Sequence, residues 1–243
     1  MKIVVQKFGG SSVANKDKLF NVCKHIIKEK DKNSGVVVVV SAQGDMTDKL
    51  ISEELEIGDS INSREHDVLV TVGEQITVSK LVMCLNSLGY KAISLLGWQV
   101  PIITNSKYGD ADIIDVKIDN IMKKLNDDFI VVVAGFQGID YGKNITTLGR
   151  GGSDTTAIAL AASLNANECI IFKDVDGVYT DDPNENKEAT RYENISYDKM
   201  IDMANKGAKI LHNKSVIMAK ENHMKIIVRS TFENNDNETI IGD

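Results

Sequence analysis

Cysteine, proline and aromatic residues are scarce in this chain of 243 residues, and long apolar runs are absent. The three cysteines, Cys23, Cys84 and Cys169, show no CxxC or Cys/His spacing. This argues against disulfides or zinc and favours free buried thiols in a reducing compartment. The N-terminus lacks the apolar core of a signal peptide, and no run approaches the roughly 18 residues of a membrane span. We therefore expect a cytoplasmic protein without a membrane partner.

Net charge and composition limit the kinds of partner. The formal charge is −7 at pH 7, which gives no general attraction for nucleic acid or anionic lipid, so an anionic ligand must meet local cations. With 42% hydrophobic and 26% charged residues, the chain can bury a sizeable core. Pro101 and Pro183 are the only prolines, and no linker is visible. We read residues 1–243 as one domain with two lobes, about 1–165 and about 166–243.

Apolar β-branched runs alternate with segments of helical period, which predicts an α/β fold with a mostly parallel sheet covered on both faces. One helical stripe contains Leu19, Val22, Cys23, Ile26 and Ile27, and a second, longer helix is predicted through Val68, Val72, Ile76 and Leu81. Strands are predicted at Ile3–Val5, Val36–Val40, Ala92–Leu95, Phe129–Ala134, Cys169–Phe172 and Lys225–Val228.

Segments rich in glycine, serine, threonine and charged residues follow the carboxyl ends of these strands, where open α/β sheets bind ligands. The segments are KFGGSSV (7–13), SAQGDMTDKL (41–50), AGFQG (134–138), TLGRGGSDTTA (147–157) and KDVDGVYTDDP (173–183). Glycines let N–H groups turn toward one anion, and Lys7 adds a positive charge. In GRGGSD, Ser153 and Asp154 open an apolar helix, Thr155–Leu164, whose N-terminus also attracts anions. One crevice at this edge is expected to collect these segments.

Simpler structural readings stand beside the functional ones. KFGGSSV also fits a tight strand-to-helix turn with a serine N-cap, and Ser153 or Thr47 also fit helix caps. Tyr179 also fits an aromatic residue that fills the core. The four histidines, His25, His66, His212 and His223, show no triad or metal spacing, so we expect structural roles for them.

Seven motifs together resemble the aspartokinases, which belong to the amino-acid kinase superfamily. They are KFGGSSV, SAxGxxTDKL, RExDxLVTVGEQ, GWQ, TLGRGGSDTTA, DVDGVYTxDP and KGAKILH, and they cover nearly the whole chain in the family's order. The resemblance implies a three-layer αβα sandwich of the carbamate kinase-like type. It also implies transfer of the ATP γ-phosphoryl group to the β-carboxylate of L-aspartate, the first step toward lysine, threonine and methionine, with Mg²⁺ held by the ATP phosphates and not by protein ligands.

The site residues implied by the resemblance fall into three groups. The catalytic positions are Lys7, Asp154 and Lys209; the aspartate positions are Ser41, Thr47, Glu74, Arg150 and Ser153; and the ATP positions are Lys7, Gly9, Gly10, Ser11, Lys173, Asp174, Tyr179 and Lys209. Three positions depart from the family: Lys173 replaces a usual threonine, Asn184 a usual arginine and Gln43 a common methionine. Lys173 and Asn184 place the adenine and phosphate contacts in question.

The chemistry of these residue types agrees with the resemblance. A carboxylate nucleophile is ionised at pH 7, so no general base is needed. Cations, backbone N–H groups and a metal must instead stabilise the transferring phosphoryl group. We therefore expect Asp154 to organise lysines or metal, Arg150 to grip the α-carboxylate of aspartate, and Glu74, on an apolar helix, to accept the α-ammonium group.

Aspartokinases usually continue into regulatory ACT domains, and no segment up to Asp243 resembles one. We therefore expect no inhibition of this chain alone by lysine or threonine and a homodimer built on the kinase domain, and a separate regulatory chain is a candidate partner. Two alternative functions remain at this point. One is another kinase of the superfamily acting on an acidic amino acid or a nucleotide; the other is a non-catalytic sensor of amino acids or nucleotides.

Overall fold

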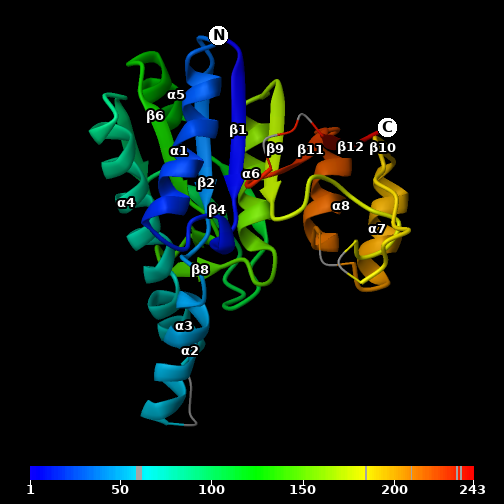
Figure 1. Ribbon diagram of the computed structural model, residues 1–243. Coiled ribbons are helices and arrows are strands. Elements are labelled where there is room, and N and C mark those ends of the chain that lie inside the picture. The colour runs from blue at the N-terminus through cyan, green and yellow to red at the C-terminus, as the bar shows by residue number, and fades with distance from the viewer. Residues whose placement is uncertain (59–61, 184, 209, 234, 236) are drawn as a thin grey trace.

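The computed structural model describes residues 1–58, 62–183, 185–208, 210–233, 235 and 237–243, and its centre is an eight-stranded sheet (Figure 1). The strand order is β10-β12-β11-β9-β1-β2-β6-β3, and all neighbours are parallel except β11 and β12. The strands are β1 (Ile3–Phe8), β2 (Gly35–Val40), β3 (Ala92–Leu95), β6 (Ile130–Ala134), β9 (Glu168–Lys173), β10 (Asn194–Ile195), β11 (Ile226–Ser230) and β12 (Glu238–Ile241). All six predicted strands are confirmed.

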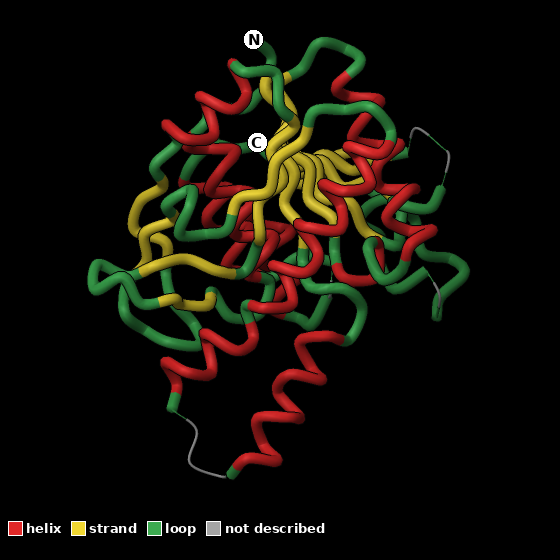
Figure 2. Tube along the Cα trace, turned by 90° about the vertical axis from the view of Figure 1, so that its left-hand side faces the viewer, coloured by secondary structure: helices red, strands yellow, loops and turns green. Residues whose placement is uncertain are grey.

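Helices cover both faces of this sheet, which confirms the three-layer sandwich (Figure 2). Apolar side chains of α1 (Lys16–Lys30) and α4 (Val72–Ser87) pack on one face. Those of α5 (Asp119–Asn126), α6 (Gly152–Ser163), α7 (Tyr197–Asn205) and α8 (Asn213–Glu221) pack on the other. The predicted stripe from Leu19 to Ile27 lies on the buried side of α1.

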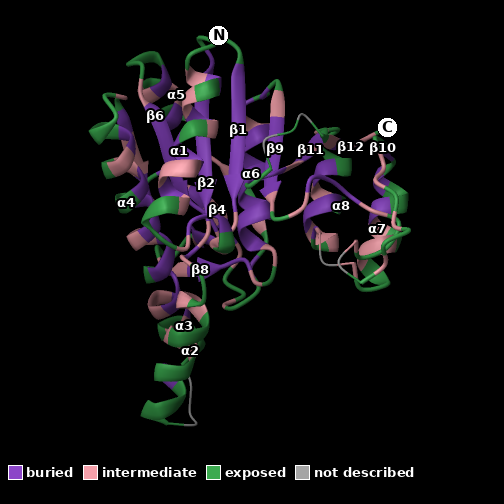
Figure 3. Ribbon diagram, in the orientation of Figure 1, coloured by how far each residue is buried: buried purple, intermediate pink, exposed green. Residues whose placement is uncertain are grey.

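The valine run of β2 shows why the sheet needs two helical layers. All five residues of Val36–Val40 are 0% exposed. Val37 and Val39 join the core on one face, and Val36, Val38 and Val40 join the core on the other. Burial of such a side chain is worth roughly 1.5–3 kcal/mol, so this strand is stable only in the middle of the sheet, where Figure 3 shows the buried residues.

A second sheet and a projecting helix pair were not predicted. The sheet has the order β5-β4-β7-β8 and contains β4 (Ile102–Thr104), β5 (Ile113–Val116), β7 (Gln137–Ile139) and β8 (Ile145–Thr147). The helices α2 (Met46–Ile57) and α3 (Ser63–Val70) project from the body of the protein (Figure 1). The short helix η1 (Gly10–Ser12) follows β1. The four strands of the second sheet are three or four residues long, which is too short for a periodic sequence pattern to identify them.

Two consecutive helices, α3 and α4, stand where one longer helix was predicted through residues 68–81. Thr71 joins them, and its carbonyl oxygen accepts a bond from Gln137 Nε2 at 3.2 Å. A side chain from β7 thus contacts the backbone at the junction. The stretch 63–87 is long and apolar enough to cross a membrane, but 44% of its most apolar window is buried inside the protein. Core helices meet the same criterion, so this is weak evidence for a membrane span.

Candidate active site

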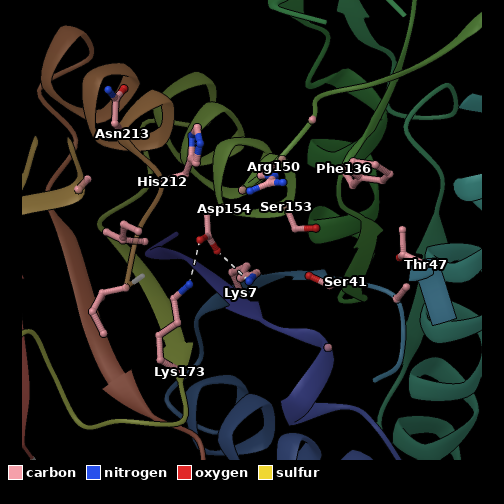
Figure 4. Close-up of a pocket in the computed structure, with 18 of the residues that line it drawn as sticks. Lys7, Ser41, Thr47, Phe136, Arg150, Ser153, Asp154, Lys173, His212 and Asn213 are labelled. Atoms are coloured by element: carbon pink, nitrogen blue, oxygen red, sulfur yellow. Dashed lines mark hydrogen bonds and ion pairs between the residues drawn. The ribbon is translucent and has the colours of Figure 1, made fainter. Parts of the chain in front are cut away.

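A cavity of about 1140 Å³ lies at the edge where the parallel strands end (Figure 4). All five expected segments contribute lining residues, AGFQG through Phe136 and KDVDGVYTDDP through Lys173. The predicted residues that line it are Lys7, Gly10, Ser41, Thr47, Glu74, Arg150, Ser153, Asp154 and Lys173. Positions far apart in the sequence therefore share one site.

Asp154 holds two lysines at the floor of this cavity (Figure 4). Its Oδ1 lies 2.8 Å from Lys7 Nζ, and its Oδ2 lies 2.9 Å from Lys173 Nζ. The side chains of Lys7 and Asp154 are 7% and 5% exposed. Burial would raise the pKa of Asp154, but Lys173 and Lys7 hold it at about 2. Burial also lowers the pKa of Lys7, although Asp154 opposes this shift. The ionised cluster carries one surplus positive charge.

The strand register brings this cluster together. β1 and β9 are parallel neighbours in which Lys7 lies opposite Ile171, so Lys7 and Lys173 leave the same edge of the sheet. Asp154 stands in the first turn of α6, where a negative charge interacts favourably with the helix dipole. The turn before α6 contains Gly151 with φ +71°, and a Cβ there would lie 2.5 Å from His212 Cβ. Glycine thus lets the start of α8 pack against the start of α6.

The glycine loop after β1 packs against the loop after β2. A Cβ on Gly10 would lie 2.7 Å from the Ala42 carbonyl oxygen, so only glycine permits this approach. Gly9 lies beside the amine of Lys7. The predicted serine N-cap is wrong, because Asn15 caps α1 by accepting from Lys18 N. A turn of η1 separates strand and helix, which leaves the loop open toward the cavity.

Ser153 and Thr47 do not cap helices, so the capping alternatives for them are wrong. Gly151 occupies the N-cap of α6 and Asp45 that of α2, and neither cap has a side-chain hydrogen bond. Ser153 is 8% exposed and packs against Gly135, where a Cβ would lie 2.7 Å from the Ser153 hydroxyl. Figure 4 shows Ser41, Thr47 and Ser153 along the cavity.

Glu74 supplies a buried carboxylate with a free oxygen. The residue is 2% exposed, and its Oε1 accepts a hydrogen bond from Ala42 N at 2.9 Å. Its Oε2 is buried and has no hydrogen-bond partner in the described part of the chain. Burial raises the pKa of Glu74 to about 7, although the Ala42 N–H opposes the shift. An unpaired acceptor in a cavity wall suits a cationic ligand group.

Arg150 supplies a free cation on the loop before α6. It is exposed, lines the cavity, and forms no ion pair with any residue that the structure describes. Figure 4 shows its side chain next to Ser153 and Asp154. A guanidinium in this setting can bind a carboxylate through two parallel hydrogen bonds.

Some of the predicted nucleotide residues do not line the cavity. These are Gly9, Ser11, Asp174 and Tyr179, and Asp174 is exposed. The half-buried Tyr179 donates its hydroxyl to Asp176 Oδ1 at 2.6 Å, so it does not simply fill the core. Lys209 and Asn184 lie outside the described residues.

Phe136 and His212 line the cavity but were not predicted. Phe136 has a φ of +69°, which is rare for a bulky residue, and its side chain packs against Gly152. His212 and Asn213 begin α8 at the cavity wall. The sequence signal for His212 was its place at the end of KGAKILH. The expectation that His212 has only a structural role is therefore open, whereas His25 packs against the stacked rings of Phe8 and Phe172.

The described residues contain no group of three or more His, Cys, Asp or Glu side chains placed to hold a metal ion. Both oxygens of Asp154 already face lysines. The cavity floor therefore supplies cations for an anionic ligand.

The sequence of this chain is similar to a known family and to known proteins of that family. The model of the amino acid kinase family matches residues 2–230. An aspartokinase of Bacillus sp. (strain MGA3) is 49% identical over 240 residues, which are 99% of this chain and 58% of that protein. The chain thus spans little more than half the length of this relative.

Two solved structures extend the likeness to three dimensions. The aspartate kinase from Synechocystis superposes with a TM-score of 0.87 at 38% identity, over 98% of this chain and 40% of that one. Aspartokinase III of E. coli, solved with aspartate and ADP, superposes with a TM-score of 0.88 at 27% identity, over the whole of this chain and 65% of that one.

Proposed function

We propose that this chain, which belongs to the amino acid kinase family, transfers the γ-phosphoryl group of ATP to the β-carboxylate of L-aspartate. The products are 4-phospho-L-aspartate and ADP. The similarity to aspartokinases supports this substrate pair, and the cavity offers a partner for each of its charges.

The Lys7–Asp154–Lys173 cluster is the observation that carries the proposal. Lys7 and Asp154 are buried, the cluster holds one surplus positive charge, and Asp154 remains ionised because its pKa is about 2. Asp154 is therefore a poor general base. A carboxylate acceptor needs no base, but the reaction needs stabilisation of the charge that spreads over the transferring phosphoryl oxygens. The two ammonium groups supply that stabilisation.

Recognition of aspartate follows from two unpaired groups in the cavity wall. Glu74 Oε2 accepts the α-ammonium group, and the guanidinium of Arg150 binds the α-carboxylate. Ser41, Thr47 and Ser153 line the same cavity and donate hydroxyl hydrogen bonds to the substrate carboxylates. The β-carboxylate then faces the cations of the Lys7 cluster.

The nucleotide lies toward β9 in this proposal, between residues of the two lobes, about 1–165 and about 166–243. Gly9, Gly10 and Ser11 present backbone N–H groups, and Lys7 and Lys173 contact the phosphates, with further ATP contacts assigned to Asp174, Tyr179 and Lys209. The N-terminal ends of α6 and α8 line the cavity and favour negative charge. Mg²⁺ bound to the ATP phosphates would supply further positive charge beside Lys7 and Lys173.

A hydroxamate assay for acyl phosphate tests the proposal. Purified protein is incubated with ATP, Mg²⁺ and hydroxylamine, together with aspartate, glutamate, N-acetylglutamate or UMP. We expect hydroxamate with aspartate alone, while ADP release with UMP would indicate a nucleotide kinase. No turnover of any acceptor, with nucleotide binding retained, would favour a sensor. A homodimer, a separate regulatory chain and a cytoplasmic location stay predictions.

A further inference from the structure

Asp67 is a buried carboxylate outside the cavity, and within the described chain its partners are two backbone amides and one hydroxyl group. It is 0% exposed. Its oxygens accept from Gly109 N at 3.0 and 3.1 Å, from Thr147 N at 2.8 Å and from Thr147 Oγ1 at 2.8 Å. No ion pair with a described residue neutralises it. A buried charge retained in this way requires its full set of hydrogen bonds.

The carboxylate joins two loops that form one side of the cavity. Gly109 belongs to the loop between β4 and β5, and Thr147 ends β8 just before Arg150. The loops also contact each other, since Ala111 N donates to Thr147 O at 2.8 Å. A Cβ on Gly149 would lie 2.9 Å from Asp110 Oδ1. Gly109, Gly149 and Arg150 all line the cavity.

We propose that Asp67 is a positioning residue that acts through Arg150. By fixing Thr147 and Gly109, the Asp67 carboxylate sets the path of residues 147–150 and thereby the direction of the Arg150 guanidinium. This role rests on the proposed function, in which Arg150 binds the α-carboxylate of aspartate. Asp67 touches no substrate, so its effect reaches the reaction only through the loop.

The Lys7–Asp154–Lys173 cluster is held by contacts that do not involve Asp67. Loss of the Asp67 carboxylate should therefore affect Arg150 and not this cluster. Thr155 N donates to Gly151 O at 3.0 Å in the first turn of α6, and Asp154 is fixed by Lys7 and Lys173. Loss of the Asp67 carboxylate therefore leaves Asp154 in place. Arg150 forms no ion pair with a described residue that would hold it if the loop moved.

Asp67→Asn tests the proposal, because it keeps the shape but turns one acceptor oxygen into a donor that faces backbone N–H groups. We expect KM for aspartate to rise about 10- to 100-fold, which is the scale expected when a binding group is displaced. The values of kcat and of KM for ATP should change less than about threefold. Glu29→Gln is the matched control. Glu29 is a buried acid, 4% exposed, on α1 outside the cavity, and its replacement should leave all three constants unchanged.

A double-mutant cycle shows whether the effect passes through Arg150. In an Arg150→Ala background, Asp67→Asn should raise KM for aspartate less than about twofold, because the residue it positions is already gone. Additive effects of the two substitutions would overturn the proposal. If Asp67→Asn fails to fold, Thr147→Val removes only the hydroxyl donor, and we expect the same pattern at about three- to tenfold.

Hydrogen exchange of backbone amides gives a readout without activity. In folded Asp67→Asn, exchange should accelerate at least about tenfold in residues 107–111 and 147–151 but not in α1 or α6. Unchanged exchange and unchanged KM would overturn the proposal. If the wild type does not phosphorylate aspartate, the proposed function fails by itself, and exchange still decides whether Asp67 holds the loop.

Discussion

Lys7 and Lys173 share one buried carboxylate, so each affects the charge that the other presents to a ligand. Both lie within 3 Å of Asp154, at 2.8 and 2.9 Å. Removing Asp154 would leave two neighbouring ammonium groups that repel each other, and removing one lysine would leave a neutral pair without surplus charge. The lysines are therefore the informative positions for substitution.

Lys7→Ala should lower kcat by roughly 10² or more, the scale of one lost electrostatic partner in a transition state. KM for aspartate should change little, because Glu74 and Arg150 carry recognition. The measurement is steady-state kinetics with both substrates varied. A kcat within about threefold of the wild type would remove Lys7 from the mechanism.

Lys173→Thr is the matched variant, since threonine is the residue expected here from the family resemblance. Lys173 is 17% exposed against 7% for Lys7, so solvent screens its charge more. We expect Lys173→Thr to lower kcat less than Lys7→Ala does. Lys173→Arg, which keeps the positive charge, should have a higher kcat than Lys173→Thr. A larger loss than for Lys7→Ala would show that Lys173 is the main cation of the site.

Glu74 should make both stability and aspartate binding depend on pH. Its pKa rises from an ordinary value of 4.5 to about 7 on folding. A pKa that is raised in the folded state favours folding fully below the unfolded value, and this contribution is lost as pH rises through the folded value. The wild type without ligand should therefore lose on the order of 3 kcal/mol between about pH 4.5 and pH 7 through this group.

Glu74→Gln removes this dependence. The variant should unfold at a higher temperature than the wild type at pH 8 and at nearly the same temperature at pH 5, as calorimetry can measure. Aspartate binding should behave in the opposite way, because only ionised Glu74 holds the ammonium group, so the affinity of the wild type should increase from pH 6 to pH 8. Equal stability of the two proteins at pH 8 would contradict the raised pKa.

At the scale of elements, the long apolar strands were predictable, whereas most of the short strands were not; β3, with four residues, is the exception. The valine run of β2 and the apolar run of β6 are buried on both faces. Their nearly continuous apolar composition predicts this burial. β7 and β8 are three residues each; they pair with each other as a short hairpin, and β7 also pairs with β4, more than 30 residues earlier in the chain. At Thr71, where α3 and α4 meet, the carbonyl oxygen accepts a hydrogen bond from Gln137, a distant contact that no local pattern near α3 reveals.

Some residues of the candidate site were likewise predictable from the sequence and others were not. Lys7, Asp154 and Arg150 were predictable because glycines and charges stand together after apolar strands. The role of Asp67 was not, since its partners are backbone amides at positions 109 and 147, and amides carry no signature in the sequence. Phe136 and His212 reach the cavity through backbone turns set by tertiary packing.

At the scale of the whole molecule, the cavity joins residues from Lys7 to Asn213, and so joins nearly the full length of the described chain. Lys214 on α8 adds a contact between the halves, because its Nζ lies 2.7 Å from Asp112 Oδ1 and 2.8 Å from Ala111 O. Ligands that fill such a cavity bind the folded chain only, and they should stabilise both predicted lobes together.

ADP and aspartate should therefore raise the temperature of a single cooperative unfolding transition. A ligand at about 100 times its Kd adds about 2.7 kcal/mol, and a chain of this size gains roughly 2–4 °C for each kcal/mol, so each ligand should contribute about 5–10 °C. Arg150→Ala should lose the aspartate increment and keep that of ADP, which separates recognition from folding. Two transitions in calorimetry, with only the later one shifted by ADP, would show instead that residues 1–165 and 166–243 unfold as independent units.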